Sequence, residues 1–564
     1  MPNRREPLNF ADATGGLNLR SGQLQLAPNE SPEMCNIALD PLGGVYTRPG
    51  WSRWNAGNIV APDTAWDPRR GYLTQLSDGT DVVYLAANDT VFHATGSHTF
   101  VDSAMACSAV THLCDFASLG DTTYFARGRT HQGAHREGTG AFAPLTSGGS
   151  GSWNDDYINP VGGVMPQAEL CEGHAGYLFT AHIVEDGTDL PNRLRWSHPT
   201  SPEDWAELDF LDIGDGGSHI TGLMSFEDHL LIFKPDSMWA LYGYDTDSWQ
   251  LVKKSSTIGA RGPHGITRSE TAVFFHSASD RGGIYAYGGE RPVEISTQLR
   301  RAFEDLIQLD LVWVGWMARK LWVTMAWNYA GPSEENASTF VYDPSVGEGA
   351  WTYYTSNVGP LGPIVAGSNI DSQFRPLGVL RSSEHPFVMA LDLLEAAWDA
   401  TGTLSMIGAS TPGSLVAIPI LTNTGAAIEA SGSPGLIPFE TYYRTPWFDN
   451  GWPTRKKSWR RPDLVCRRVG APYKLQVRSF RDYNDANARR QSTLAVDGSG
   501  STRWGEFTWG HATWNASASG GSEIERGSSF GLARALQIRF AGLTPGIPWG
   551  IDAVVFKLTM RRFI

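Results

Sequence analysis

The sequence predicts a mainly β protein: a β-propeller-like body with an irregular N-terminal arm and a second, C-terminal β unit. Its 62 Gly and 33 Pro supply many turns, and its 21 Trp, 18 Tyr and 24 Phe supply side chains that pack well on pleated sheets. From about residue 70 to 395, an apolar run, a Gly or Asp turn and an alternating run recur. Intervals of roughly 40–55 residues suit the small antiparallel sheets of a propeller, and we expect about six to eight of them.

The length of the chain calls for more than one ordinary core. We expect an N-terminal arm over 1–55, the propeller-like body over 56–398, a loop-rich boundary over 399–440 and a C-terminal β domain over 441–564. The boundary is rich in Gly, Thr, Ser and Pro, which are turn and loop residues. A set of stacked β-sandwiches is the alternative architecture.

Several hairpins are readable in the repeated pattern. The clearest covers 220–233, with Glu227 and Asp228 at the turn, and 238–242 adds a third strand. Segments 71–86 and 116–126 repeat the theme, and 193–197 is the expected partner of 175–181. In the C-terminal domain, 474–478, 535–540 and 554–560 alternate cleanly, which predicts strands with one buried face.

Two short helices are expected among the strands. Ser31 and Pro32 suit the cap and the first position of a helix over 31–36. Ser296 suits the cap of a second helix. The helical spacing of the apolar residues in this second helix indicates a packing face, made by Leu299, Ala302, Phe303 and Leu306.

Composition limits the classes of function. The formal net charge is −14, and an acidic chain does not hold nucleic acid by its overall field. No apolar run approaches the ~20 residues of a membrane span, and no signal peptide is expected at the N-terminus. An odd, widely spaced cysteine set favours synthesis in a reducing compartment over a disulfide framework. These cysteines are Cys35, Cys107, Cys114, Cys171 and Cys466.

The sequence shows no catalytic or cofactor motif. Phosphate loops, Gly-x-Ser-x-Gly elbows and His-Glu-x-x-His pairs are absent from it. One group of zinc-ligand types deserves mention, but its spacing is wider than the paired ligands of zinc sites. It consists of Cys107, His112 and Cys114, with Cys171 and His174 further along. We therefore expect no metal, no cofactor and no enzymatic activity.

A basic segment stands out in the C-terminal domain of an otherwise acidic chain. It consists of Arg455, Lys456, Lys457, Trp459, Arg460 and Arg461. One interpretation is a contact with an acidic patch on a neighbouring subunit. A second is a phosphate backbone with Trp459 stacking on a base. A third is a solvated edge strand whose charges prevent stray pairing.

The order of motifs near the N-terminus resembles the opening of many bacteriophage tail proteins. Among them are the tail nozzle, or tail tubular protein B, of short-tailed phages and the propeller-type minor tail or tail-hub proteins of some long-tailed phages. The motif residues are Gly15, Gly16, Asn18, Pro32, Asn36, Arg48, Pro49 and Gly50. Segments 193–205 and 231–242 and the stretch before Ser296 are also similar to these proteins. The similarity covers most of 10–355 and is weaker over 400–560.

The resemblance implies a structural component of a virion tail, assembled in the bacterial cytoplasm as a ring, hexameric in such proteins, around a DNA channel. Its implied partners are copies of itself, the tail adaptor, tail fibres and, in transit, genomic DNA. Head-to-tail ring contacts need two different complementary patches on each subunit. The alternative is a carbohydrate-binding propeller at the tail tip, with Trp504, Trp509 and Trp514 as candidates for stacking on sugars.

Overall fold

The computed structural model describes residues 5–560 except 11, 56–57, 61–65, 96–97, 108–113, 146–164, 200–201, 207, 215–216, 278–281, 305–311, 327–336, 356–360, 367–376, 381–387, 395–397, 404–435, 470–471, 498–521 and 546. Strands predominate among these residues, which confirms the mainly β class. The helical elements among the described residues are the 3-10 turns η1 (Pro263–Gly265) and η2 (Thr297–Leu299) and the helix α1 (Arg300–Glu304). Over the same ranges, no helix has the length and apolar character needed to cross a bilayer.

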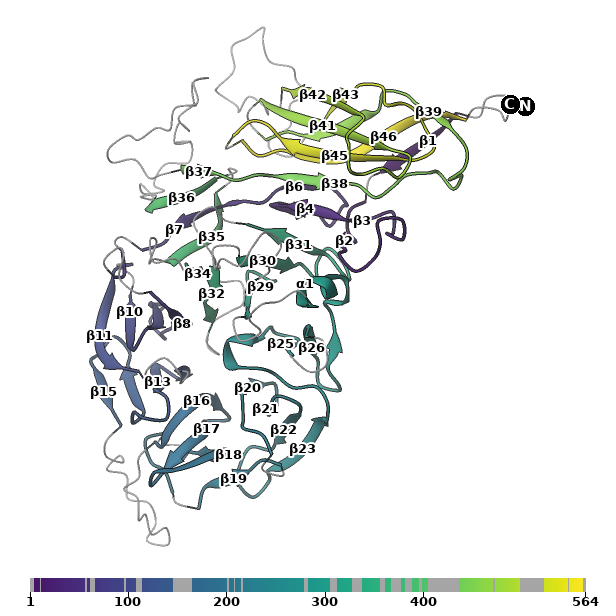
Figure 1. Ribbon diagram of the computed structural model, residues 1–564. Helices are drawn as coiled ribbons and strands as arrows, with labels where there is room; N and C mark the ends of the chain where they lie inside the picture. The colour runs from purple at the N-terminus through teal and green to yellow at the C-terminus, as the bar shows by residue number, and fades with distance from the viewer. Residues whose placement is uncertain are drawn as a thin grey trace.

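Six four-stranded antiparallel units, blades I to VI, follow one another along the chain. Their strands are β8 (Pro68–Gln75), β9 (Asp81–Ala87), β10 (Thr90–Ala94) and β11 (Phe100–Ala106) in blade I; β12 (Asp115–Leu119), β13 (Thr122–Ala126), β14 (Ala134–Glu137) and β15 (Phe142–Pro144) in blade II; β16 (Gln167–His174), β17 (Tyr177–Glu185), β18 (Thr188–Trp196) and β19 (Phe210–Asp212) in blade III; β20 (Gly222–Phe226), β21 (His229–Phe233), β22 (Met238–Tyr242) and β23 (Gln250–Ser255) in blade IV; β24 (Ile266–Arg268), β25 (Val273–His276), β26 (Ile284–Tyr287) and β27 (Val293–Glu294) in blade V; and β28 (Trp313–Met317), β29 (Lys320–Ala326), β30 (Ala337–Tyr342) and β31 (Trp351–Tyr354) in blade VI. The first strands of successive blades contact one another around a common centre (Figure 1). The body is therefore a β-propeller.

A seventh blade closes the ring with strands from both ends of the body. It contains β32 (Leu361–Pro363), β34 (Leu377–Leu380), β35 (Val388–Leu394) and β7 (Gly50–Arg53). β32 contacts β28 and β8, and β33 (Val365–Ala366) pairs in parallel with β8. Strand β7 precedes blade I in the chain and pairs antiparallel with β35. This pairing ties the start of the propeller to its end and removes an open sheet edge.

The second unit is a β-sandwich that both ends of the chain build together. One sheet has the order β43-β40-β46-β39-β44, with β1, β5 and β6 attached, and the other has the order β4-β38-β45-β41-β42. β1 pairs along β46, from Arg5↔Thr559 to Phe10↔Val554, so both chain ends lie together (Figure 1). The strands are β1 (Arg5–Phe10), β4 (Glu33–Cys35), β5 (Ile37–Leu39), β6 (Val45–Thr47), β38 (Tyr442–Arg444), β39 (Lys457–Trp459), β40 (Asp463–Arg467), β41 (Tyr473–Arg481), β42 (Arg490–Val496), β43 (Ser522–Arg526), β44 (Gly531–Ala533), β45 (Leu536–Gly542) and β46 (Gly550–Met560).

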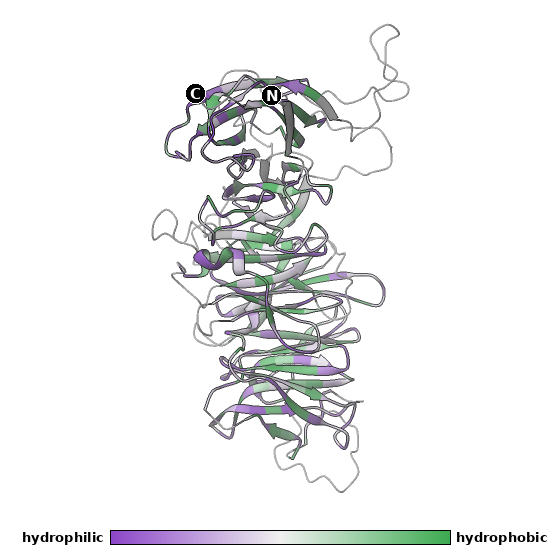
Figure 2. Ribbon diagram, turned by 90° about the vertical axis from the view of Figure 1, so that its right-hand side faces the viewer, coloured by the Kyte–Doolittle hydropathy of each residue, from purple (hydrophilic) through white to green (hydrophobic). Residues whose placement is uncertain are grey.

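Short strands connect the two units. β36 (Trp398–Thr403) pairs in parallel with β7, and β37 (Leu436–Pro438) pairs with β36. β2 (Gly16–Leu17) and β3 (Glu30–Ser31) form a small parallel pair beside blade VI. Figure 2 shows the result, an elongated molecule with the sandwich at one end and the propeller forming the rest.

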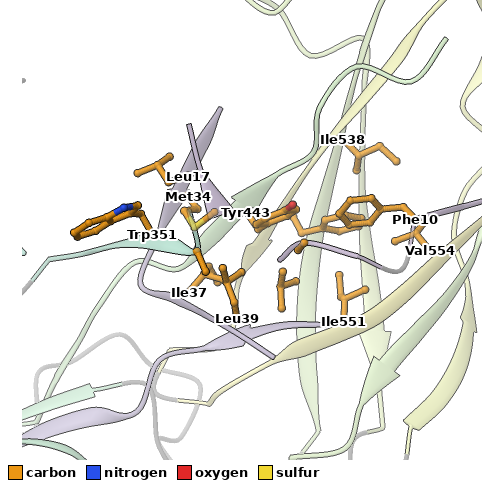
Figure 3. Close-up of a cluster of buried hydrophobic side chains, with 14 of the residues drawn as sticks. Phe10, Leu17, Met34, Ile37, Leu39, Trp351, Tyr443, Ile538, Ile551 and Val554 are labelled. Carbon is orange, nitrogen blue, oxygen red and sulfur yellow. The ribbon is translucent and has the colours of Figure 1, made fainter. Parts of the chain in front are cut away.

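One buried apolar cluster runs from the propeller into the sandwich. It begins at Trp351 in blade VI, passes through Met34 and Tyr443, and reaches Phe10 and Val554 between the two sheets (Figure 3). Burial of a large apolar side chain contributes about 1.5–3 kcal/mol, so this cluster holds the two units together.

The first 55 residues, set apart as an irregular arm from their sequence, are integral to both units. They supply β1, β4, β5 and β6 to the sandwich and β7 to blade VII. Ile37, Leu39 and Val45 are buried in the shared cluster. These residues gain a core from strands more than 300 positions away, a pairing that local sequence patterns do not reveal.

Of the two predicted helices, the structure contains only the second. The helix over 31–36 is wrong, because this segment forms β3 and β4 and Asn36 has a φ of 53°. The second helix is present as η2 and α1, and Leu299, Ala302 and Phe303 pack in the core as expected, whereas Leu306 lies outside the described residues. Ser296 does not cap it with its side chain; its hydroxyl accepts the Ile284 amide instead.

The predicted hairpins are confirmed. The turn at Glu227 and Asp228 joins β20 to β21, and β22 follows as the third strand. β17 and β18 pair with Phe179 opposite Trp196. The C-terminal segments form β41, β45 and β46. The boundary expected over 399–440 lies mostly outside the described residues.

Candidate functional site

The N-terminal motif residues meet where the sandwich joins the propeller. Asn36 is fully buried between β4 and β5 and uses both ends of its amide. Its Nδ2 donates to the Thr355 hydroxyl (2.9 Å) and the Glu440 carbonyl (2.8 Å), and its Oδ1 accepts Arg48 Nε (2.8 Å) and the Thr355 amide (2.9 Å). Because Thr355 follows blade VI and Glu440 precedes β38, one side chain links three segments.

Arg48 completes this junction from the other side. Its guanidinium is fully buried and donates to the carbonyls of Thr355 and Pro49, at 2.9 Å each. The group also lies 4.1 Å from the Trp51 ring and 3.8 Å from the Phe439 ring, within the range of cation–π attraction. Trp51 belongs to β7 and Phe439 to the entry into the sandwich, so Arg48 clamps the two units.

The other motif residues shape the chain for this junction. Gly16 has a φ of +66°, and a Cβ there would lie 2.7 Å from the backbone of Trp351. A Cβ on Gly15 would lie 2.9 Å from the carbonyl of Asn29. Asn18 accepts the amides of Arg20 and Ser21 and closes a turn. Pro32 separates β3 from β4, and Gly50 begins β7 after Pro49. The motif is therefore a structural device.

The basic segment divides into buried and exposed members. Lys457 is fully buried, and its ammonium donates to the carbonyls of Trp452, Arg455 and Arg534. Burial lowers the pKa of Lys457. Trp459 is 1% exposed and donates to the Ala533 carbonyl. The interpretation of Trp459 as a stacking platform is wrong, because alternation along β39 turns its ring into the core.

The exposed members belong to a larger cationic surface on one sheet of the sandwich. Alternation places Lys456 and Arg460 on the outer side of β39, since Lys457 and Trp459 point inward. Register then brings further side chains of β44, β46 and β43 to the same side. We call this surface the cationic face; it consists of Lys456, Arg460, Arg526, Arg534 and Lys557, with exposed Ile524 and Leu532 among them. Arg461 is exposed beside it.

Two carboxylates, Asp463 and Asp482, reduce the charge of the cationic face without cancelling it, and Asp482 Oδ1 accepts the Arg534 amide (2.6 Å). Asp463 in β40 lies 2.5 Å from Lys557 Nζ and 3.7 Å from Arg526 Nε. Ile524 is 72% exposed on the edge strand β43. Trp452, 47% exposed, lies at the rim with the Arg455 guanidinium 4.5 Å from its ring. Exposed aromatic and apolar side chains among cations are typical of protein interfaces.

Formal charge is divided unequally between the two units. Residues 441–564 contain 20 Lys and Arg against 9 Asp and Glu, whereas 1–55 contain five of each, so the sandwich segments carry +11. Residues 56–440 contain 20 Lys and Arg against 45 Asp and Glu, a charge of −25. The formal net charge of −14 is therefore the sum of an acidic propeller and a basic sandwich. A charge count over 441–564 is the sequence signal that would have revealed this.

One face of the propeller carries a group of exposed carboxylates. Turns between first and second strands and between third and fourth strands emerge on the same face, because neighbouring strands are antiparallel. In blades IV and V these turns carry six exposed carboxylates, which outnumber the exposed Arg291 and the Lys254 ammonium on the Gly289 carbonyl. We call these carboxylates the acidic face: Glu227, Asp228, Asp245, Asp247, Glu270 and Glu290. Tyr244, 70% exposed, lies among them.

Hydrogen bonds keep carboxylates of the acidic face ionised. The side chain of His229, 2.9 Å from Asp228, lowers the pKa of that carboxyl. Hydrogen bonds from the Ser248 hydroxyl and amide lower the pKa of Asp245. Asp228 and Asp245 therefore remain ionised in mildly acidic solution.

The propeller axis is crossed by charged side chains. Arg70, in the first strand of blade I, donates to the Pro263 carbonyl before blade V (2.6 Å) and lies 3.2 Å from Asp115 of blade II. Glu172 of blade III accepts the Ser225 amide, and Arg268 of blade V donates to the Ser225 carbonyl. Burial raises the pKa of Asp115 and raises that of Glu172 to about 7. These contacts join blades I to V across the centre.

Of the metal-ligand types singled out from the sequence, the Cys107 and Cys114 side chains lie together in a buried apolar cluster. Cys107, Cys114 and Cys171 are buried free thiols, and His112 lies outside the described residues. His174 Nδ1 lies 2.9 Å from the Ser225 hydroxyl. In the part of the chain that the structure describes, no group of three His, Cys, Asp or Glu side chains could hold a metal ion. Trp504, Trp509 and Trp514 also lie outside the described residues.

Comparison with solved structures returns propellers of varied function. Virginiamycin B lyase from Staphylococcus aureus is 11% identical, with 59% of this chain and 97% of that chain covered and a TM-score of 0.38. The WD40 domain of Pan2 from Neurospora crassa is 9% identical, with 61% and 96% covered and a TM-score of 0.37. YCF48 from Cyanidioschyzon merolae is 8% identical, with 61% and 98% covered and a TM-score of 0.35.

Similarity at this level carries no argument about activity. No protein-family model and no curated protein matches the sequence. The assignment of a propeller rests on the strand order of the seven blades and on the contacts between their first strands.

Proposed function

We propose that this protein is a structural, non-enzymatic component of a bacteriophage tail, a nozzle or distal hub that assembles from identical copies into a ring around the DNA channel. The order of N-terminal motifs supports the proposal, and the structure gives those motifs a mechanical role. Asn36 and Arg48 fasten the sandwich to the propeller, and such a joint suits a particle that must transmit force between its parts.

The observation that carries the proposal is the separation of charge. A closed ring of identical subunits requires that each copy present two different surfaces that fit each other. The cationic face lies on the sandwich and the acidic face on blades IV and V, of which blade IV lies at the end of the molecule far from the sandwich (Figure 1).

Genome passage in this proposal runs between copies. Arg70, bonded to Pro263 and close to Asp115, occupies the axis of a single propeller, so a duplex cannot thread it. The channel is then the centre of the ring, and the acidic propellers give it a wall that does not adhere to phosphates. Other proposed partners are the tail adaptor and tail fibres, and the location is the virion tail.

Electron microscopy of the purified full chain tests the proposal. Negatively stained particles are expected to show uniform hollow rings, and native mass spectrometry should give one discrete multiple of the 61.6 kDa chain mass. Monodisperse monomers at concentrations far above micromolar would contradict the proposal.

A further inference from the structure

The cationic face is an exposed sheet surface whose positive charge is only partly compensated by neighbouring carboxylates. Its five cations outnumber the two carboxylates beside them, Asp463 and Asp482, and its Ile524 is 72% exposed. β43, which carries Ile524, is an edge strand that pairs only with β40 among the described strands. Covering this surface would remove apolar area from water and pair its charges.

The acidic face has the matching properties. Six carboxylates on the turns of blades IV and V share this face with Tyr244, which is exposed in the turn between β22 and β23. Aromatic side chains are enriched in the energetic centres of interfaces, and charged residues at their rims. A face with cations around Ile524 and a face with carboxylates around Tyr244 are therefore complementary in both charge and apolar content.

One molecule cannot bring its own two faces together. Strands β39 and β46 lie at the sandwich end of the molecule, and β20 to β23 lie at the far end of the propeller (Figure 1). The junction at Arg48 and Asn36 fixes the units, so a contact between these faces must join different copies.

On this basis we propose that the cationic face of one copy docks on the acidic face of the next, and that this contact is the head-to-tail interface of the ring. The inference rests on the proposed function and names the surfaces that carry it. The contact is heterologous, since each copy gives one face to one neighbour and the other face to the other. Its charges act at short range at physiological salt, where the screening length is about 8 Å.

Charge reversal on each face tests the interface separately. The sandwich variant is Lys456→Glu, Arg460→Glu and Arg534→Glu, and the propeller variant is Glu227→Lys, Asp247→Lys and Glu290→Lys; all six residues are exposed. A matched control reverses three exposed cations of neither face: Arg20→Glu, Arg261→Glu and Arg301→Glu. Circular dichroism and thermal melts check that every variant folds.

Sedimentation velocity and native mass spectrometry give the readout. Each reversed variant alone should lose assembly, with a rise of about 100-fold or more in the apparent dissociation constant, because like charges then face each other. The control should assemble like the wild type. An equimolar mixture of the two reversed variants should assemble again, since each then offers the other a complementary face, and the two chains should alternate in equal numbers.

Other outcomes separate the two levels of the proposal. Reversed variants that assemble like the wild type would overturn this interface and leave the ring itself standing. A wild type that never assembles would overturn the ring and the interface together. If the sandwich variant assembles normally but loses binding of a labelled DNA duplex that the wild type holds, the cationic face is a nucleic-acid surface and the inference is wrong.

Discussion

Replacement of Arg48 by methionine probes the joint between sandwich and propeller. Methionine retains much of the volume and fits irregular apolar space, so the change removes mainly the guanidinium. The carbonyls of Thr355 and Pro49 each then lose a donor, at a cost of about 1–3 kcal/mol per unsatisfied group, while Asn36 Oδ1 keeps the Thr355 amide as its donor. The contacts with the rings of Trp51 and Phe439 contribute about 1 kcal/mol each.

These contributions are partly offset, because the variant no longer buries a charge. We expect Arg48→Met to lower the free energy of unfolding by about 3 kcal/mol. Arg20→Met is the matched control, since Arg20 is exposed in the same N-terminal segment and should change stability by less than about 0.5 kcal/mol.

Equilibrium urea unfolding, followed by tryptophan fluorescence, gives the comparison, and limited proteolysis shows whether the two units separate first. A clamp at the junction predicts earlier cleavage between the units in Arg48→Met than in Arg20→Met. If Arg48→Met unfolds within 0.5 kcal/mol of the wild type and resists protease equally, the junction is not held by this residue and the reasoning fails.

Four further changes test other parts of the structure. Glu172→Gln should remove a pH dependence of the free energy of unfolding. The native pKa of about 7 exceeds the ordinary 4.5, so the stability of the wild type should fall relative to that of the variant as pH rises from about 4.5 to 7. Urea midpoints of the two proteins that change in parallel between these pH values would contradict this. Arg70→Met should destabilise the propeller by about 3–5 kcal/mol by leaving Asp115 unpaired, and a calorimetric transition like that of the wild type would argue against the axial network. Gly16→Ala should lower the melting temperature by several degrees, because its φ is positive and the backbone of Trp351 fills the space, whereas Gly22→Ala, with open space, should not. All five cysteines are buried, and burial raises the pKa of Cys35 to about 11, so a thiol reagent should label none in the native protein and five after denaturation; rapid native labelling would refute their burial.

Local pattern was enough to predict the strands of the propeller. Alternation around a turn at Glu227 and Asp228 gave β20 and β21, because a hairpin is determined by neighbouring residues. The helix predicted over 31–36 failed because the competing interactions are distant: β4 pairs with β38, more than 400 positions along the chain, and Ser31 donates to the Arg444 carbonyl. A local cap signal carries no information about such partners.

The candidate site was predicted only in part. The basic segment predicted from the sequence lies in the sheet that carries the cationic face. Its composition does not say which side chains face outward, and Lys457 and Trp459 are core residues. Arg526, Arg534 and Lys557 join the cationic face through strand register, which spans distant segments. The motif residues Asn36 and Arg48 were recognised in the sequence, and their role as a junction emerged only with Thr355 and Glu440 beside them.

The most direct test of the whole account is a density map of the assembled particle, obtained by electron cryomicroscopy from the wild-type chain. The account predicts a closed ring in which the outer surface of β39 and β46 in each copy rests against the turns of blades IV and V in its neighbour, with an open centre between the copies. A particle whose copies touch through other surfaces while both charged faces stay exposed to solvent would contradict it.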